Sequence, residues 1–330
     1  MLKNNKVRVG LTIGDPAGIG PTIILKAMER LKDLAEFTVI GDKGVFEKSQ
    51  KSLPAGESGK VKNIEYKFID LDNVPRKNFK FGQLKAEYGR ASVEYLDKAL
   101  ELIKNDSIDC LTTCPVSKEA IGLSGLKGFS GHTEYLASRV HTKHFAMMLL
   151  NSKLKISLVT RHIALKDVAR YISIDKIYNT IAITCESLRG LFGIRKPRII
   201  VCGLNPHASD NGLIGDEENR VIKPALARLK KKLKGVCIDG PQAADVAILK
   251  AYEGRYDAII AMYHDQALIP LKICGGYTGV NLTLGFSFVR TSPLHGTAFD
   301  IADKYGLANP QSLIEAVRLA VKCTLNQKRA

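Results

Sequence analysis

The sequence lacks any apolar stretch near the ~18–20 residues that a transmembrane helix needs, although 45% of its 330 residues are hydrophobic. Its N-terminus, Met1 to Arg8, is basic, but the apolar run after it breaks at Gly14-Asp15-Pro16, so no signal-peptide core fits there. Internal repeats and low-complexity tracts are also missing. We therefore expect a cytoplasmic protein that does not associate with membranes.

Cysteines are few and scattered, seven in all. Only Cys110 and Cys114 lie close together, and their three-residue gap differs from the CxxC of zinc and redox sites. An odd set of cysteines, mostly within apolar runs, indicates small buried hydrophobes in a reducing compartment. Two domains of ordinary size bury enough surface to fold without disulfides.

Both common nucleotide fingerprints are absent. Gly14-Asp15-Pro16-Ala17-Gly18-Ile19-Gly20-Pro21 separates a predicted strand from a predicted helix, but it matches neither GxGxxG nor GxxxxGK[ST]. Taken alone, the segment predicts a tight strand-to-helix turn near an active site.

Nucleic-acid-binding signatures are missing as well, although the net charge is +16. The densest basic run, at 230–234, ends a helical pattern, where cations suit the helix dipole. No helix-turn-helix, zinc finger or RNP-like aromatic pattern accompanies it. We interpret the charge as a solvated surface that also attracts an anionic substrate, and we expect no nucleic-acid partner.

Short β-branched runs alternate with longer amphipathic segments, which predicts an α/β fold with a largely parallel sheet. The predicted strands are Val7–Ile13, Phe37–Ile40, Ile64–Ile69, Cys110–Thr113, Phe145–Leu150, Ile156–Val159, Arg198–Val201, Val246–Leu249 and Ala258–Met262. The predicted helices are Pro21–Lys32, Gly89–Asn105, Thr133–Val140, Lys166–Tyr171, Ile174–Gly190, Glu218–Lys232 and Pro310–Gln327. The stretch Lys43–Lys62 is predicted to be a loop or short insertion.

Three histidines each follow a predicted strand: His162, His207 and His264. Their separations of 45 and 57 residues match no local metal signature, but a site assembled from strand ends needs none. By spacing alone, structural histidines and a metal site both stay open. Asp265 follows His264 and Asp245 precedes a predicted strand, so either aspartate could orient a ligand or act as a base.

Further polar residues lie where ligands of open α/β folds bind. Lys118 follows a predicted strand, and His132 precedes Thr133, a candidate helix N-cap. Lys272, Asn281 and Arg290 together could bind a phosphate or carboxylate, with the guanidinium giving a bidentate contact. Each of them alone also fits a solvated surface group or, for His132, a structural histidine.

Seven blocks, read in order, resemble the 4-hydroxythreonine-4-phosphate dehydrogenase family of vitamin B6 synthesis. They are GDPAGIGP (14–21), PVSKEAI (115–121), GHTEYLA (131–137), LVTRHIALKDV (158–168), GLNPHASDNGLIGDEE (203–218), YDAIIAMYHDQALIPLK (256–272) and VNLTLGFSFVRTSPLHGTAFDIA (280–302). The blocks span nearly the whole chain.

The resemblance implies two α/β/α domains like those of isocitrate and isopropylmalate dehydrogenases, with the active site in the cleft between them. We expect residues 1–130 with 290–330 to form one domain and residues 131–289 to form the other. A homodimer is implied, sharing between its subunits a divalent metal, zinc, magnesium or cobalt, held by His162, His207 and His264.

The resemblance also assigns ligand roles to residues of this sequence. Substrate binding falls to His132, Thr133, Lys272, Asn281 and Arg290. The HGTAFDIA…ANP stretch is similar to an adenosine-binding loop, which makes NAD or NADP contacts candidates at His295, Gly296, Thr297, Asp300 and Asn309. Lys118, Asp245 and Asp265 are the candidate proton acceptors.

The implied reaction oxidises 4-phosphooxy-L-threonine to 2-amino-3-oxo-4-phosphooxybutanoate, which decarboxylates to 3-amino-2-oxopropyl phosphate. Several positions depart from the family pattern: Thr22, Ser117, Gln242-Ala243, Phe286-Ser287 and Leu294. They leave open a relative that oxidises 4-phospho-threonate or erythronate. A nucleic-acid-binding module and a phosphate-acetyltransferase-like protein are the alternatives from other classes.

Overall fold

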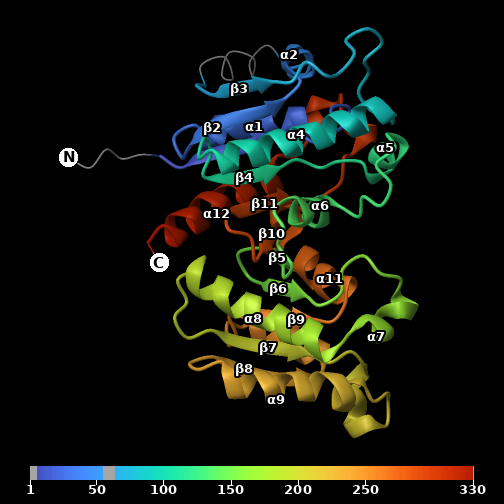
Figure 1. Ribbon diagram of the computed structural model, residues 1–330, viewed down its shortest axis with the longest axis vertical. Helices are drawn as coiled ribbons and strands as arrows, with labels where there is room; N and C mark the ends of the chain where they lie inside the picture. The colour runs from blue at the N-terminus through green and yellow to red at the C-terminus, as the bar shows by residue number, and fades with distance from the viewer. Residues whose placement is uncertain (1–5, 55–63, 330) are drawn as a thin grey trace, which may run out of the picture. The chain divides into compact units, whose positions relative to one another are not determined.

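A computed structural model describes residues 6–54 and 64–329, and the chain divides into two compact units. The first unit comprises Met1–His141 with Ser287–Leu325, and the second comprises Thr142–Phe286 with Asn326–Ala330. Each unit consists of strands flanked by helices (Figure 1), which confirms the predicted α/β class. The sequence-based division assigned residues 131–141 to the second domain, whereas helix α6 (His132–Arg139) lies in the first unit.

The first unit is built on parallel strands in the spatial order β3-β2-β1-β4-β11. Their bounds are Arg8–Thr12 for β1, Glu36–Gly41 for β2, Lys67–Asp70 for β3, Cys110–Thr113 for β4 and Val289–Pro293 for β11. β1, β4 and β11 are buried at nearly every position, as strands covered on both faces require. Because they run parallel, the segments at 14–21, 114–118 and 294–297 leave the same edge of the sheet.

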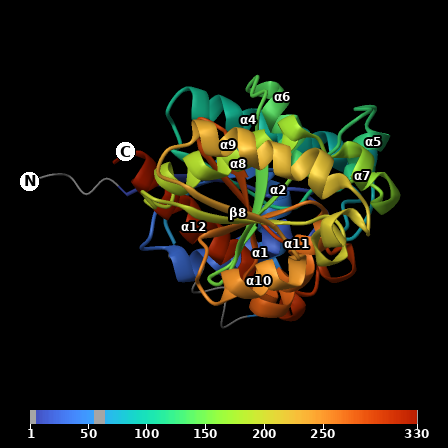
Figure 2. The same cartoon turned by 90° about the horizontal axis from the view of Figure 1, so that it is seen from below.

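Helices cover both faces of this sheet, with α1 and α4 on opposite sides (Figure 2). Helix α1 spans Gly20–Leu31, and its buried apolar positions recur every three to four residues. The other helices of this unit are α2 (Lys43–Lys51), α4 (Ala86–Lys104), α5 (Lys118–Leu123), α6 and α12 (Gln311–Gln327).

The second unit has strands in the order β10-β5-β6-β9-β7-β8. Their bounds are Ala146–Leu150 for β5, Lys155–Leu158 for β6, Arg198–Cys202 for β7, Cys237–Gln242 for β8, Ala258–Ala261 for β9 and Val280–Leu284 for β10. β5 is antiparallel to both of its neighbours, whereas β6, β9, β7 and β8 are mutually parallel. The carboxyl ends of β6, β7 and β9 thus share one edge, and each is followed within a few residues by one of the three histidines.

Helices α8 (Ile174–Gly190) and α9 (Lys223–Lys232) lie on one face of these strands, and α10 (Ala244–Tyr252) and α11 (His264–Gly275) on the other (Figure 2). The short helix α7 spans Val168–Tyr171. A core of buried side chains, including Ile181, Leu188 and Ile260, joins α8 and α9 to the strands. No helix in residues 6–54 and 64–329 combines the length and the apolar character needed to cross a membrane.

Two element predictions are wrong. Val246–Leu249 belongs to helix α10, not to a strand, and the strand precedes it as β8. A short apolar run fits either element, and the buried alanines Ala247 and Ala251, one helical turn apart, show which of the two formed. Lys43–Lys51 is helix α2, capped by Asp42, rather than a loop, while residues 55–62 of the predicted loop lie outside the described residues.

Candidate active site

Arg290 is a buried charge in the first unit. It lies on β11 opposite Leu111 of β4, with only 1% of its surface exposed. Its guanidinium donates to the hydroxyls of Thr113 and Thr133, the latter over 3.3 Å. Burial lowers the pKa of Arg290 to about 9, and the Glu134 carboxylate opposes this shift. A pKa of about 9 keeps the group charged at neutral pH. Its burial shows that the interpretation of Arg290 as a solvated surface charge is wrong.

His132 begins helix α6 beside this guanidinium. Burial lowers the pKa of His132 well below its usual range, and the charges of Arg290 and Lys118 lower it further, against a hydrogen bond to the Cys114 backbone. Nε2 is buried without a hydrogen-bond partner in the described structure, so Nδ1–H is the donor to Cys114. The ring is therefore neutral at neutral pH and presents Nε2 as an acceptor.

Because its folded pKa is depressed, His132 should make the free energy of unfolding decrease as the pH is lowered. Below the unfolded pKa of about 6.5 the unfolded chain binds a proton that the folded chain excludes. The free energy of unfolding should therefore drop less between about pH 7 and pH 5 in His132→Asn than in the unmodified protein. Urea unfolding at the two pH values measures this. Exposed His141→Asn is the control, and identical pH slopes for His132→Asn and the unmodified chain would contradict the prediction.

Lys118 lies near the same helix end. It begins helix α5 after the Ser117 cap, and a Cβ built on Gly131 would lie 3.9 Å from its Nζ. Gly131 has φ of +153° and precedes the first turn of α6, whose backbone N–H groups point toward this region. We call Lys118, His132, Thr133 and Arg290 the Arg290 cluster. Its two cations, hydroxyl and helix N-terminus suit a phosphate or carboxylate.

The 14–21 turn packs against the predicted cofactor loop. Ile19 N donates to Thr297 O over 2.8 Å, and Asp15 N donates to Pro115 O over 2.9 Å. Gly14 has φ of +72°, and a Cβ there would lie 2.3 Å from Pro115 O, so only glycine fits. Burial raises the pKa of the Asp15 carboxyl to about 7. The turn thus ties together the segments that carry Lys118 and Thr297.

The other predicted cofactor residues lie in the first unit as well. His295 and Gly296 are exposed, and a Cβ built on Gly296 would meet no atom within 4 Å. The backbone of this loop is therefore accessible to a ligand. Asp300 is exposed, whereas the Asn309 side chain accepts from Gln311 N over 2.9 Å at the start of α12.

Two of the three candidate metal ligands lie together in the second unit. The His162 and His264 ring centroids are 5.6 Å apart, and His264 Nδ1 lies 2.6 Å from Asp265 Oδ1. A carboxylate on one ring nitrogen is the usual outer partner of a metal-binding histidine, which then ligates through the other nitrogen. The two rings therefore offer imidazole donors that suit a divalent ion, and Asp265 is placed to orient His264.

His207 is exposed and lies in a left-handed stretch of backbone. Within the described part of this one chain, no three His, Cys, Asp or Glu side chains lie together as a metal-binding group. Lys272 on α11 and Asp245 at the start of α10 are both exposed, and Asn281 is half-buried on β10.

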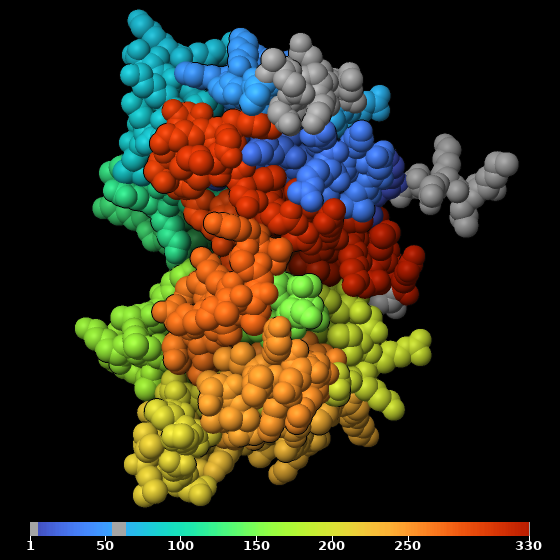
Figure 3. Space-filling model, turned by 180° about the vertical axis from the view of Figure 1, so that it is seen from behind, coloured from blue at the N-terminus to red at the C-terminus, as the bar shows by residue number. Residues whose placement is uncertain are grey.

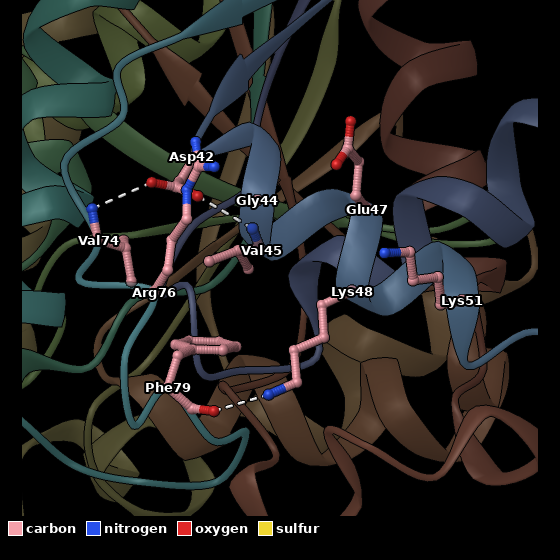
Figure 4. A pocket seen from close by; sticks show the side chains of 9 residues that line it. All are labelled: Asp42, Gly44, Val45, Glu47, Lys48, Lys51, Val74, Arg76 and Phe79. Carbon is pink, nitrogen blue, oxygen red and sulfur yellow. Dashed lines mark hydrogen bonds between the residues drawn. The ribbon is translucent and has the colours of Figure 1, made fainter.

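A cavity of about 300 Å³ lies elsewhere in the first unit (Figure 4). Two of its polar side chains are engaged by the protein itself: Asp42 accepts from Val45 N and Val74 N, and Lys48 donates to Phe79 O over 2.7 Å. It contains none of the predicted site residues.

Sequence reasoning missed three side chains beside these candidates. Thr113 accepts from Arg290, and Glu218 and Gln266 hydrogen-bond the loop that carries His207. Each lies inside or next to a quoted block, but only the folded contacts show its partner.

Comparison with known proteins gives the family. The sequence model described as "Pyridoxal phosphate biosynthetic protein PdxA" matches residues 33–320. A 4-hydroxythreonine-4-phosphate dehydrogenase from Sulfurihydrogenibium sp. (strain YO3AOP1) is 42% identical over 320 residues, 96% of this chain and 98% of the relative. A D-threonate 4-phosphate dehydrogenase from Salmonella typhimurium is 39% identical over 325 residues, 95% of this chain and 98% of the relative.

A solved structure supports the same family assignment. The crystal structure of 4-hydroxythreonine-4-phosphate dehydrogenase from Klebsiella pneumoniae has a TM-score of 0.85 and 34% identity, covering 98% of this chain and 99% of that one. The chain therefore belongs to the PdxA family, whose relatives are named as dehydrogenases of 4-hydroxythreonine 4-phosphate or D-threonate 4-phosphate.

Proposed function

We propose that this protein oxidises 4-phosphooxy-L-threonine with NAD or NADP and a divalent metal, in pyridoxine 5′-phosphate biosynthesis. The secondary alcohol loses a hydride and a proton to give 2-amino-3-oxo-4-phosphooxybutanoate. That β-keto acid loses CO₂ to give 3-amino-2-oxopropyl phosphate. The observation that carries the proposal is the buried Arg290 guanidinium beside Thr133 and the start of α6.

The chain's own residues bind and orient the substrate. Arg290, Thr133 and Lys118 supply donors for an anionic group, and neutral His132 accepts a hydrogen bond through Nε2. Lys272 and Asn281 are proposed to contact the substrate as well. Lys118 and Asp245 are the remaining candidates for the proton acceptor, because Asp265 is engaged by His264.

His162, His207 and His264 are the proposed metal ligands, and the 295–297 loop with Asp300 and Asn309 is the proposed dinucleotide site. When bound, the metal stabilises negative charge on a substrate oxygen and the nicotinamide accepts hydride. Imidazole donors accept zinc and cobalt readily, whereas magnesium prefers oxygen ligands.

The direct test is reduced-cofactor formation by metal-loaded protein, with 4-phosphooxy-L-threonine and 4-phospho-D-threonate offered separately. We expect the higher kcat/KM with 4-phosphooxy-L-threonine. A higher kcat/KM with the threonate would support the alternative, a 4-phospho-threonate dehydrogenase, which is the activity named for the Salmonella typhimurium relative. No turnover of either would overturn the dehydrogenase proposal.

The proposed enzyme is a homodimer that completes its metal site between subunits. We propose that the exposed side of helix α11 forms the dimer interface. Ile269, Ile273 and Tyr277 recur every four residues along α11 and the turn after it, with exposures of 58%, 80% and 73%. The segment around α10 and α11 is orange in Figure 3, at the surface of that face. Such a row of large exposed apolar side chains marks an interface, and His264 begins the same helix.

Ile273→Asp should convert the dimer to a monomer, because it places a charge in an expected apolar contact. Burying such a side chain contributes roughly 1.5–3 kcal/mol, and in a symmetric dimer each subunit loses this contribution. Light scattering after size-exclusion chromatography measures the change from twice the chain mass to once. Leu123→Asp, at an exposed leucine of the first unit, is the matched control and should remain dimeric. A dimer in both variants, or a monomeric unmodified chain, would reject this surface.

A further inference from the structure

The backbone around His207 is unusual. His207, Ala208, Ser209, Asp210 and Asn211 all have φ between +42° and +72°, the left-handed region. Residues with a Cβ visit this region singly, so a run of five is unfavourable by itself. This left-handed segment, 207–211, must therefore be held by contacts from outside it.

Glu218 supplies the first of these contacts. Its side chain is fully buried, and Oε1 accepts from Leu204 N and Asn205 N, both over 2.8 Å. Oε2 accepts from Asn205 Nδ2 over 2.9 Å. The carboxylate thus fixes the residues that lead into the left-handed segment.

Gln266 supplies the second contact and reaches a different loop. Its Oε1 accepts from Met262 N over 2.7 Å, and its Nε2 donates to Gly203 O over 2.9 Å. The side chain is only 8% exposed. Met262 directly follows β9 and lies two residues before His264, whereas Gly203 begins the loop that leads to His207. One amide therefore ties the two histidine-bearing loops together.

We propose that Gln266 is a positioning residue that sets the His207 loop against the His264 turn, with Glu218 holding the approach to the left-handed segment. The inference rests on the proposed function in so far as the two histidines are metal ligands. Without Gln266, Met262 N and Gly203 O lose a buried partner, and the loop loses this hydrogen bond to α11. The left-handed segment is then free to relax toward ordinary backbone conformations.

Gln266→Met tests this, because methionine keeps the length and removes both hydrogen bonds. We expect faster amide hydrogen exchange across residues 203–215 of the metal-free protein. We also expect 10–100-fold weaker Co²⁺ affinity, the usual cost of losing an outer contact, followed by visible absorption. Amide exchange in the first unit should stay unchanged.

Gln242→Glu is the control, since its half-buried side chain accepts from Lys250 and only its backbone carbonyl, which the substitution keeps, accepts from Gly203 N. Gln266→Glu is the second variant if Gln266→Met does not fold, because it keeps the Met262 acceptor and removes only the Gly203 donor. Unchanged exchange across 203–215 in the folded variant would overturn the inference. If the unmodified protein binds no Co²⁺, the proposed metal site fails, whereas the exchange measurement still decides the role of Gln266.

Discussion

Replacing Arg290 with methionine should lower kcat/KM for the phosphorylated substrate by about 100-fold or more, chiefly through KM. Truncating one partner of a buried charge pair costs roughly 2–5 kcal/mol, and every 1.4 kcal/mol is tenfold. Arg290 is 1% exposed and charged at neutral pH, so a bound anion would meet it away from competing water. Steady-state formation of reduced cofactor over a range of substrate concentrations measures the effect.

Two companion variants make the result specific. Arg290→Lys keeps the charge but loses the planar fork, so it should fall between methionine and arginine. Arg139→Met, at a half-exposed arginine paired with Asp97, should leave KM unchanged. Arg290→Met removes a charge whose burial costs desolvation free energy and puts an apolar side chain of similar length in its place, so the fold should tolerate it. An unchanged KM and kcat with normal melting would remove Arg290 from the site.

The sequence predicted the fold class and the sheet edges that carry the candidate residues. Runs of buried β-branched residues indicated β1, β4, β7 and β9, and the residues just after them lie at strand carboxyl ends. This logic suffices because strand periodicity and chain direction are local properties. The same reasoning placed Lys118 at the carboxyl edge of the first unit's sheet, and His162 with His264 at the carboxyl ends of strands in the second unit.

Properties that depend on tertiary contacts could not be predicted from the sequence. Taken alone in the sequence, Arg290 favoured the interpretation as a solvated charge, and the packing of β11 beside β4 is what buries it. His207 sits in left-handed backbone that no propensity favours, because Glu218 and Gln266 hold it from a distance. For α10, a short run of apolar residues fitted strand and helix alike.

His207→Ala should abolish metal binding and reduced-cofactor formation while the dimer stays folded. Because the His207 side chain is exposed, its removal leaves no cavity in the core. The loss of a direct ligand should weaken metal affinity by more than the 10–100-fold that the loss of an outer contact costs. His207→Asn is a companion that tolerates left-handed backbone. Metal content after dialysis measures metal binding, and light scattering measures whether the dimer is intact. His144→Ala, at another exposed histidine of the same unit, should bind metal normally.

Mixed dimers decide whether the subunits share the site. His162 and His264 lie 5.6 Å apart in one chain, so we expect His207 to come from the partner subunit. When His207→Ala and His264→Ala chains are unfolded, mixed and refolded, half the dimers are mixed, and each should regain one intact site. About a quarter of the unmodified activity should then return. If all three ligands belong to one chain, every site in the mixture carries a defect and no activity returns. Normal turnover by metal-stripped His207→Ala would reject the metal role itself.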